Sequence, residues 1–291
     1  MAERTLYLQC SSGISGDMSV AALIDLGADA EKVLHDLATL PLEGYEVEIS
    51  RVVKSGIDAC DFAVILDKDH ENHDHDMAYL HDLAGCVDGD HHHAHGHSHA
   101  HDNNESTTAS RELDHTHAHS HRGLKEISEI IEASRMTDGA KQLAHKIFRI
   151  LAEAEARAHG LPIDEVHFHE VGAVDSIVDI CAIAIAYDNL AVDQVIVTGL
   201  AEGQGLVRCQ HGLLPIPVPA VTFIASEYGI PLSILPIQGE LVTPTGAAFV
   251  AAVRTKSELP EAFTINAVGY GAGKRDYATS GLLRAMLIEA A

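Results

Sequence analysis

Residues 167–179 gather an unusual number of chemically active side chains. Five metal-binding side chains fall within these thirteen positions: His167, His169, Glu170, Asp175 and Asp179. If the two histidines lie on a strand, both rings point to the same side. If a helix follows Gly172, the two aspartates lie one turn apart on one face. Nitrogen and oxygen donors that converge in this way suit a borderline divalent ion such as Ni, Co, Mn or Zn.

The alternative is that Asp175 caps the helix and the histidines are ordinary surface residues. A metal or charged-ligand site is the better interpretation of so many donors in so few positions. A second donor pair, Cys209 and His211, has alternate-residue spacing, which on a strand turns a thiol and an imidazole to one side. A half-buried cysteine beside a surface histidine would explain that pair equally well.

Three glycine- or hydroxyl-rich segments are candidates for binding substrate anions, because backbone amides at helix starts attract negative charge. The candidate residues are Ser12, Gly13, Ser15, Gly16, Thr243, Thr245, Gly246 and Lys274. Asp17, at the end of the first segment, either holds a metal or catalyses, or simply caps a helix. A tight turn at residues 12–17 and a threonine cap at Thr243 are the structural alternatives. Residues 269–276 are predicted to form a glycine loop carrying two cations.

The composition excludes several classes of function. A formal net charge of −24 and the absence of Trp argue against binding nucleic acid or anionic membranes, and favour cations. No apolar run is long enough for a membrane helix, and no signal peptide is apparent at the N-terminus. The five cysteines are scattered, which is typical of reduced thiols in a cytoplasmic protein.

Hydrophobic periodicity predicts a mixed α/β or α+β fold, in which a mixed sheet packs with helices. Strands are expected at 5–10, 45–53, 59–66, 194–199, 232–235, 263–268 and 283–288, and helices at 18–26, 31–40, 124–134, 140–159, 176–190 and after Pro244. The proline-alternating run 213–219 is expected to be a stiff extended arm that lines a groove or interface.

Residues 67–122 interrupt this pattern. They hold 15 of the 21 histidines and too little apolar surface to offset the entropy of ordering, so we expect a disordered insert that binds divalent metal. The predicted organisation is therefore residues 1–66 as the first part of an α/β domain, 67–122 as the insert, and 123–291 as the remainder carrying the metal and substrate motifs.

Together these segments resemble the LarC family, which inserts nickel into the pincer nucleotide cofactor of lactate racemase. The matching segments are Ser12–Met18, Leu40–Tyr45, Ala152–Glu155, His167–Asp179, His211–Gly212 with the following prolines, Glu240–Gly246 and Gly269–Gly273. Two positions depart from the family pattern. Gln9 stands where the family usually has Asp, and Ser11 replaces an expected Phe.

The resemblance implies a nickel chelatase or cyclometallase of the lyase class. The reaction would be CTP-dependent, assisted by Mn2+ or Mg2+, and would place nickel into pyridinium-3,5-bisthiocarboxylic acid mononucleotide through two Ni–S bonds and one Ni–C bond. The implied catalytic residues are Asp17, Glu170 and Cys209, with nickel donors at His167, His169, Glu170, Asp175, Asp179 and His211.

Family members generally continue into a C-terminal part associated with CTP binding, whereas this chain ends at Ala291. The expected partners are that C-terminal part and apo-lactate racemase as cofactor recipient. Activity without the C-terminal part and assembly into a homo-oligomer both stay open. Two other functions also stay open: a non-enzymatic nickel metallochaperone or store using the insert, and a metal-dependent hydrolase built on residues 167–179.

Overall fold

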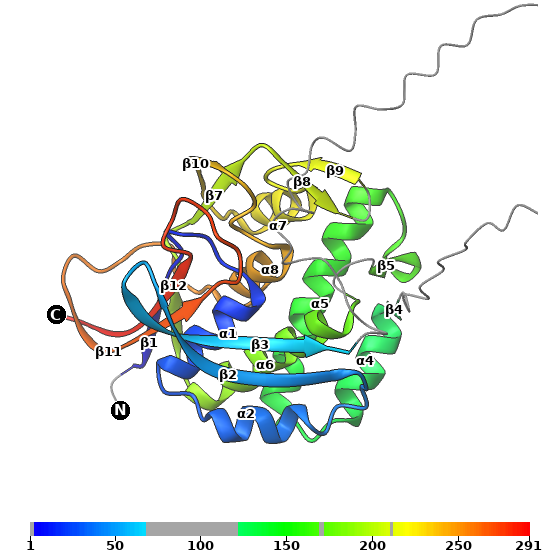
Figure 1. Ribbon diagram of the computed structural model, residues 1–291, viewed down its shortest axis with the longest axis horizontal. Helices are drawn as coiled ribbons and strands as arrows, with labels where there is room; N and C mark the ends of the chain where they lie inside the picture. The colour runs from blue at the N-terminus through cyan, green and yellow to red at the C-terminus, as the bar shows by residue number, and fades with distance from the viewer. Residues whose placement is uncertain (1–2, 68–121, 169–171, 210–211) are drawn as a thin grey trace, which may run out of the picture.

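The computed structural model describes residues 3–67, 122–168, 172–209 and 212–291 (Figure 1). The helices are α1 (Gly16–Asp25), α2 (Ala30–Leu37), α4 (Leu124–Ala133), α5 (Asp138–His159), η2 (Ile163–Glu165), α6 (Val174–Leu190), α7 (Pro219–Tyr228) and α8 (Pro244–Val253). The strands are β1 (Thr5–Gln9), β2 (Tyr45–Lys54), β3 (Ile57–Leu66), β4 (Arg122–Gly123), β5 (His167–Phe168), β6 (Gln194–Ile196), β7 (Leu200–Gln204), β8 (Leu206–Cys209), β9 (Gly212–Pro215), β10 (Leu232–Gln238), β11 (Phe263–Ala272) and β12 (Leu282–Ala290).

A six-stranded mixed sheet organises the molecule, in the order β2-β3-β11-β12-β1-β6. β2 and β3 form an antiparallel hairpin, and β11 and β12 form another. β1 runs antiparallel to β12 and parallel to β6. The predicted mixed α/β class with a mixed sheet is confirmed. Strands from before and after residues 68–121 lie side by side in this sheet.

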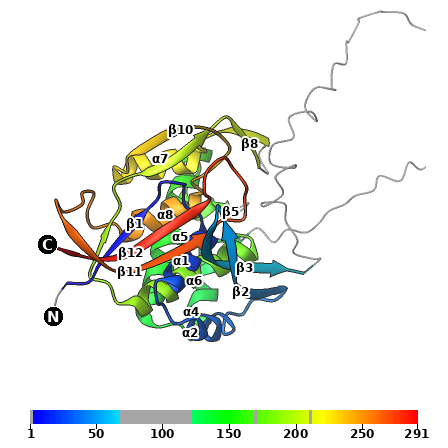
Figure 2. The same ribbon diagram turned by 60° about the vertical axis from the view of Figure 1, so that its left-hand side comes forward.

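Helices cover one side of the sheet, as the two views in Figures 1 and 2 show. Helix α1 lies directly against β3, β11 and β12, and α6 packs between α1 and α5. Two glycines of β11 permit this close contact. A methyl group on Gly271 would lie 2.0 Å from the Met18 carbonyl oxygen, and one on Gly269 would lie 2.4 Å from the Leu26 nitrogen. Segment 269–272 is therefore strand, and the predicted glycine loop at 269–276 is wrong in its first half.

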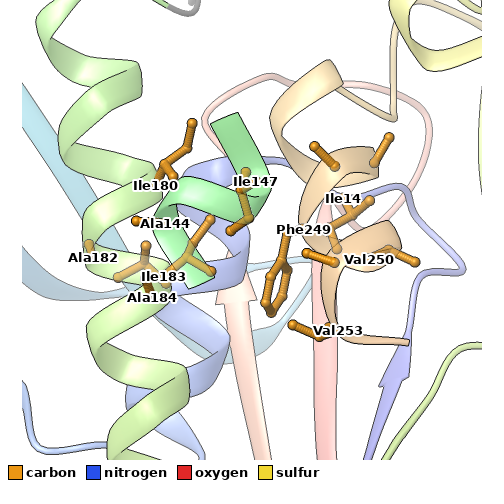
Figure 3. Packing of buried hydrophobic residues seen from close by; sticks show 14 of the residues in the cluster. Ile14, Ala144, Ile147, Ile180, Ala182, Ile183, Ala184, Phe249, Val250 and Val253 are labelled. Carbon is orange, nitrogen blue, oxygen red and sulfur yellow. The ribbon is translucent and has the colours of Figure 1, made fainter. Parts of the chain in front are cut away.

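The core lies among α1, α5, α6 and α8. Helix α6 is apolar almost all round, and 11 of its residues are buried, among them Ile180 and Ile183. Figure 3 shows these two side chains directed toward Ile147 of α5, with Phe249 of α8 close by. Burial on this scale fixes where α6 begins, and so fixes the two aspartates in its first turns.

The predicted elements are confirmed with shifts of a few residues at their ends. Helix α7 was not predicted, because the prolines that precede it suggested an extended arm. Only Gly212–Pro215 of that arm is strand, and Pro219 begins the helix. Helix α2 ends at Leu37, before the predicted residue 40. The predicted insert at 67–122 lies outside the described residues, apart from its two end residues.

Candidate functional site

A cavity of about 490 Å³ opens where several helix ends and loops meet. Its walls come from the N-termini of α1, α6 and α8, the C-terminal turns of α5, strands β3, β8 and β9, and the loop between β11 and β12. The polar lining residues are Ser15, Asp17, Glu155, His159, Asp175, Ser176, Asp179, Arg208, Cys209, Glu240, Thr243, Thr245, Lys274 and Arg275. The opposite apolar wall includes Phe62, Val64, Phe168 and Leu214.

Three carboxylates converge at the helix N-termini. Asp17 lies in the first turn of α1, and Asp175 and Asp179 lie one turn apart on α6, as predicted. The absence of a side chain at Gly16 brings the two helices together, because a methyl group there would lie 2.4 Å from the Asp179 Oδ2 atom. Ser15 is the N-cap of α1 and Ala173 that of α6, so neither Asp17 nor Asp175 is a helix cap.

This convergence disfavours charge on Asp179. Burial raises the pKa of Asp179 well above its usual range, and the neighbouring Asp17 and Asp175 raise it further, whereas Lys274 lowers it. Asp17 is 8% exposed. Its Oδ1 accepts hydrogen bonds from the Ser15 hydroxyl and the Met18 amide, and its Oδ2 is buried with no hydrogen-bond partner among the described residues. A positive charge nearby would favour the charged forms of these carboxylates.

Two cations face the carboxylates from the loop between β11 and β12. The Lys274 ammonium lies 2.5 Å from both carboxylate oxygens of Asp61, and Arg275 donates to Glu240 over 2.6 Å. Lys54 fixes the loop by donating to the carbonyl oxygens of Gly273 and Arg275. The predicted cations are thus present in the cavity wall, each already held by an acidic partner.

The C-terminal end of α5 supplies a third wall. Glu155 and His159 lie one turn apart, with 3.4 Å between the carboxylate and the imidazole Nε2. Burial raises the pKa of Glu155, and His159 beside it acts in the opposite direction. Cys209, at the end of β8, reaches the same cavity and is partly exposed. By contrast, burial raises the pKa values of the Cys10 and Cys181 thiols to about 12, which makes these two poor nucleophiles.

The two predicted anion-binding turns lie against each other. Ser15, Gly16, Thr243 and Thr245 line the cavity. Gly13 and Gly246 instead pack against backbone, beside the Leu241 and Ile14 carbonyl groups respectively. The Ser12 and Ser280 hydroxyl groups share a hydrogen bond, with 2.8 Å between the two oxygens. Thr243 is also the N-cap of α8, and its hydroxyl accepts a hydrogen bond from the Gly246 amide. The threonine cap named as the alternative is thus present, and the same residue also lines the cavity.

Several predicted donors lie outside the described residues: His169, Glu170, His211 and the side chain of His167. Strand β5 includes His167 but ends at Phe168, and Cys209 ends β8 before Gly212 begins β9. The predicted pairing of Cys209 with His211 therefore stays a prediction, because His211 lies outside the described residues. In the described part of the chain, no three His, Cys, Asp or Glu side chains are close enough to hold a metal ion.

Five polar lining residues were not among the predicted ones: Glu155, His159, Ser176, Arg208 and Glu240. Spacing of four residues on a predicted helix could have revealed the Glu155 and His159 pair. The others reach the cavity only through tertiary packing. Gln9, the departure from the family pattern, does not line the cavity, and its side-chain oxygen accepts from the Arg284 guanidinium at 2.6 Å.

The sequence is similar to known proteins over almost its whole length. The sequence profile described as "Nickel insertion protein" matches residues 6–291. The chain belongs to the nickel insertion protein family. The pyridinium-3,5-bisthiocarboxylic acid mononucleotide nickel insertion protein of Alkaliphilus metalliredigens is 49% identical over 98% of this chain and 60% of its own length. The proteins of that name from Geobacillus kaustophilus and Clostridium acetobutylicum are 40% and 44% identical over 94% and 98% of the chain.

This member of the nickel insertion family spans about 60% of the length of the curated relatives it matches. No solved structure matches it significantly. Across the described ranges, none of its helices is both long and apolar enough to cross a membrane.

Proposed function

We propose that this chain carries out, in the cytoplasm, the insertion of nickel into pyridinium-3,5-bisthiocarboxylic acid mononucleotide. The product would be the nickel-pincer cofactor that apo-lactate racemase receives. The observation that supports this proposal is the convergence of Asp17, Asp175 and Asp179 in one cavity that also presents cations and a thiol. The carboxylates suit a divalent metal, and the cations suit the phosphate and thiocarboxylate groups of the mononucleotide.

Nickel is the substrate metal in this proposal. Asp175 and Asp179 hold the incoming ion together with His167, His169, Glu170 and His211, and the substrate thiocarboxylates then replace them. Two Ni–S bonds and one Ni–C bond would form as the C–H bond of the ring carbon breaks. The released proton would be accepted by one of the catalytic residues Asp17, Glu170 and Cys209. This assigns the enzyme to the lyases as a cyclometallase.

Substrate anions would be held by the two turns that line the cavity and by the adjoining loop cation. Ser15, Thr243, Thr245 and Lys274 contact them, and Ser12, Gly13, Gly16 and Gly246 shape the two turns. CTP is a co-substrate in this proposal. The hard carboxylate oxygens of the cavity also fit the Mn2+ or Mg2+ that would accompany CTP, whose binding we assign mainly to a separate C-terminal part of the protein.

The test is reconstitution. Protein, nickel, CTP and the metal-free mononucleotide are mixed with and without the C-terminal part supplied in trans, and nickelated nucleotide is measured by mass spectrometry. We expect product when both parts are present. Absence of product under both conditions would refute the enzymatic proposal for this chain.

A second candidate function is a nickel store or metallochaperone, favoured by the concentration of 15 histidines in residues 67–122. Deletion of residues 69–121 separates the two. An inserting enzyme keeps its turnover at saturating nickel, because its site lies in the folded part. A store loses most of its bound nickel, measured by equilibrium dialysis.

Variants of the insert-deleted protein test the metal site itself. His169→Ala should lower nickel affinity about tenfold, and His167→Ala and Asp175→Ala should act in the same direction. The matched control is His145→Ala, on α5, whose ring pairs with Glu132 and does not line the cavity. If the three site variants bind nickel like the parent, residues 167–179 are structural and the site assignment is wrong.

A further inference from the structure

Glu202 is a buried acidic residue that the proposed reaction does not use. It lies on β7, has an exposed fraction of 0%, and does not line the cavity. Its Oε1 atom accepts three backbone hydrogen bonds, from Gly203 at 2.8 Å, Leu241 at 2.8 Å and Val242 at 3.1 Å. Buried backbone amides require acceptors, so this one oxygen fixes the path of the chain at Leu241 and Val242.

The segment Leu241–Thr243, which Glu202 fixes, also holds the residues that precede α1. The Ile14 amide donates to the Leu241 carbonyl at 2.9 Å, and the Thr243 amide donates to the Ile14 carbonyl at 3.0 Å. Ile14 and Val242 thus form a parallel bridge. Ile14 precedes Ser15, Gly16 and Asp17, and Thr243 begins the other cavity-lining turn. Both turns therefore depend on the position of Leu241–Thr243.

A second contact fixes Glu202 relative to the main sheet. Cys10, just after β1, bridges to Leu200 of β7, and its carbonyl accepts from the Ala201 amide at 3.1 Å. Glu202 is the next residue. The Glu202 carboxylate therefore belongs to a strand whose first residues are hydrogen-bonded to the chain just after β1. The length of the Glu202 side chain then sets the distance from β7 to the two turns.

We propose that Glu202 is a positioning residue for the cavity, acting through the Leu241–Thr243 turn on Ser15–Asp17 and on Thr243. Its side chain touches neither metal nor substrate. The part of this inference that concerns catalysis rests on the proposed function, whereas the part that concerns the two turns does not.

Amide hydrogen exchange of the full chain tests the structural part. In Glu202→Ala the amides of Ile14 and Thr243, which join the two turns, should exchange at least tenfold faster. Glu202→Gln keeps a carbonyl acceptor in place and should stay within about threefold of the parent. Asp36→Asn is the matched control, since Asp36 is a buried carboxylate of α2 that does not line the cavity. Unchanged exchange in Glu202→Ala, or equal acceleration in the control, overturns the proposal.

If Glu202→Ala does not fold, Glu202→Asp takes its place, because the shorter side chain keeps the charge but cannot reach all three amides from the same backbone position. The same exchange criteria then apply.

Kinetics test the catalytic part. In the reconstituted reaction, Glu202→Ala should raise KM for the mononucleotide at least tenfold with a smaller change in kcat, and Glu202→Gln should restore it. Faster exchange without any change in KM or kcat would mean that the turns need not be positioned, and would overturn this part. If the parent forms no product, the proposed function fails, and the exchange comparison alone decides the role of Glu202.

Discussion

Gly16 shows how a single missing side chain can decide the composition of a site. It lies at the start of α1, and the Asp179 carboxylate of α6 occupies the space where a side chain would be. The contact brings Asp17 and Asp179 together, although 162 positions separate them in the sequence. The glycine was predicted as part of a turn that approaches a ligand, yet its close neighbour is an acidic side chain of the protein itself.

Substitution of Gly16 should therefore disperse the carboxylates. Gly16→Ala places a methyl group 2.4 Å from Asp179 Oδ2 and 3.1 Å from its Cβ, so the Asp179 carboxylate must move away from its present position. We expect a loss of stability of about 1–3 kcal/mol and at least a tenfold loss of divalent-metal affinity. Calorimetry and Mn2+ titration of the insert-deleted protein measure the two effects.

The control for this substitution is Gly123→Ala. Gly123 likewise lies at the start of a helix, as the N-cap of α4, but a methyl group there would find its nearest neighbour at 3.6 Å, an ordinary contact. It should leave metal affinity unchanged. Equal affinities in Gly16→Ala and the parent would show that the approach of Asp179 is not needed for binding.

Glu202 makes a prediction about stability and pH. Burial raises its pKa from 4.5 to about 7, and the charge of nearby Glu240 adds to the shift, while the three backbone hydrogen bonds oppose it. Since the folded state binds the proton more tightly, its contribution to stability is fully present below pH 4.5 and is lost as the pH rises through about 7. At 1.36 kcal/mol per pH unit the loss totals about 3 kcal/mol.

Denaturant unfolding of the parent and Glu202→Gln between pH 4.5 and 8 measures this contribution. The difference between their unfolding free energies should change by about 3 kcal/mol over that range, in favour of the variant at high pH. Two further titratable groups lie close to Glu240. Arg275 forms an ion pair with Glu240, and both of these residues affect the pKa of Tyr277. A constant difference across the range would show that Glu202 does not titrate there.

At the scale of residues, the sequence allowed part of the site to be predicted. Asp17, Asp175 and Asp179 were predicted because helical spacing is a local property. Glu202 could not be, because a buried acid on a short strand has no pattern of its own and acquires its role only from the amides of a turn some 40 positions later. Arg208 similarly reaches the cavity only through the packing of β8.

At the scale of elements, the loop between β11 and β12 is held by several long-range contacts. Lys54 of β2 donates to two of its carbonyl oxygens and lies 3.2 Å from Asp276. Lys274 and Arg275 point their charges into the cavity wall because the loop is held in this way. The sequence predicted the cations but assigned too much of the segment to the loop, since glycines of β11 look like loop residues until α1 is placed against them.

Lys54→Met should release the loop without unfolding the sheet. We expect the mononucleotide to bind about tenfold more weakly, because Lys274 and Arg275 lose their fixed positions. Lys32→Met is the control, since Lys32 makes an ion pair with Asp36 on α2, whose residues do not line the cavity. Isothermal titration with the mononucleotide measures both variants. Identical affinities for the two would contradict a role for the loop in binding.

At the scale of the whole molecule, the helices at the sheet surface were the most predictable part, because amphipathic and all-apolar periods are strong local signals. The strand order was not predictable. Nothing local in β11 or β12 indicates that this hairpin lies between β3 and β1, which precede it by about 200 residues.

That strand order has a consequence for synthesis. Both central strands of the sheet follow its other four strands in the sequence, so β1 and the hairpin β2-β3 have no shared partner until residues 263–290 have emerged from the ribosome. The carboxylates of α1 and α6 are translated earlier, but the Lys274 and Arg275 wall that faces them arrives with the same late hairpin. A nascent chain therefore cannot present a finished cavity to metal ions in the cell, and the completed site exists only once translation has passed β12.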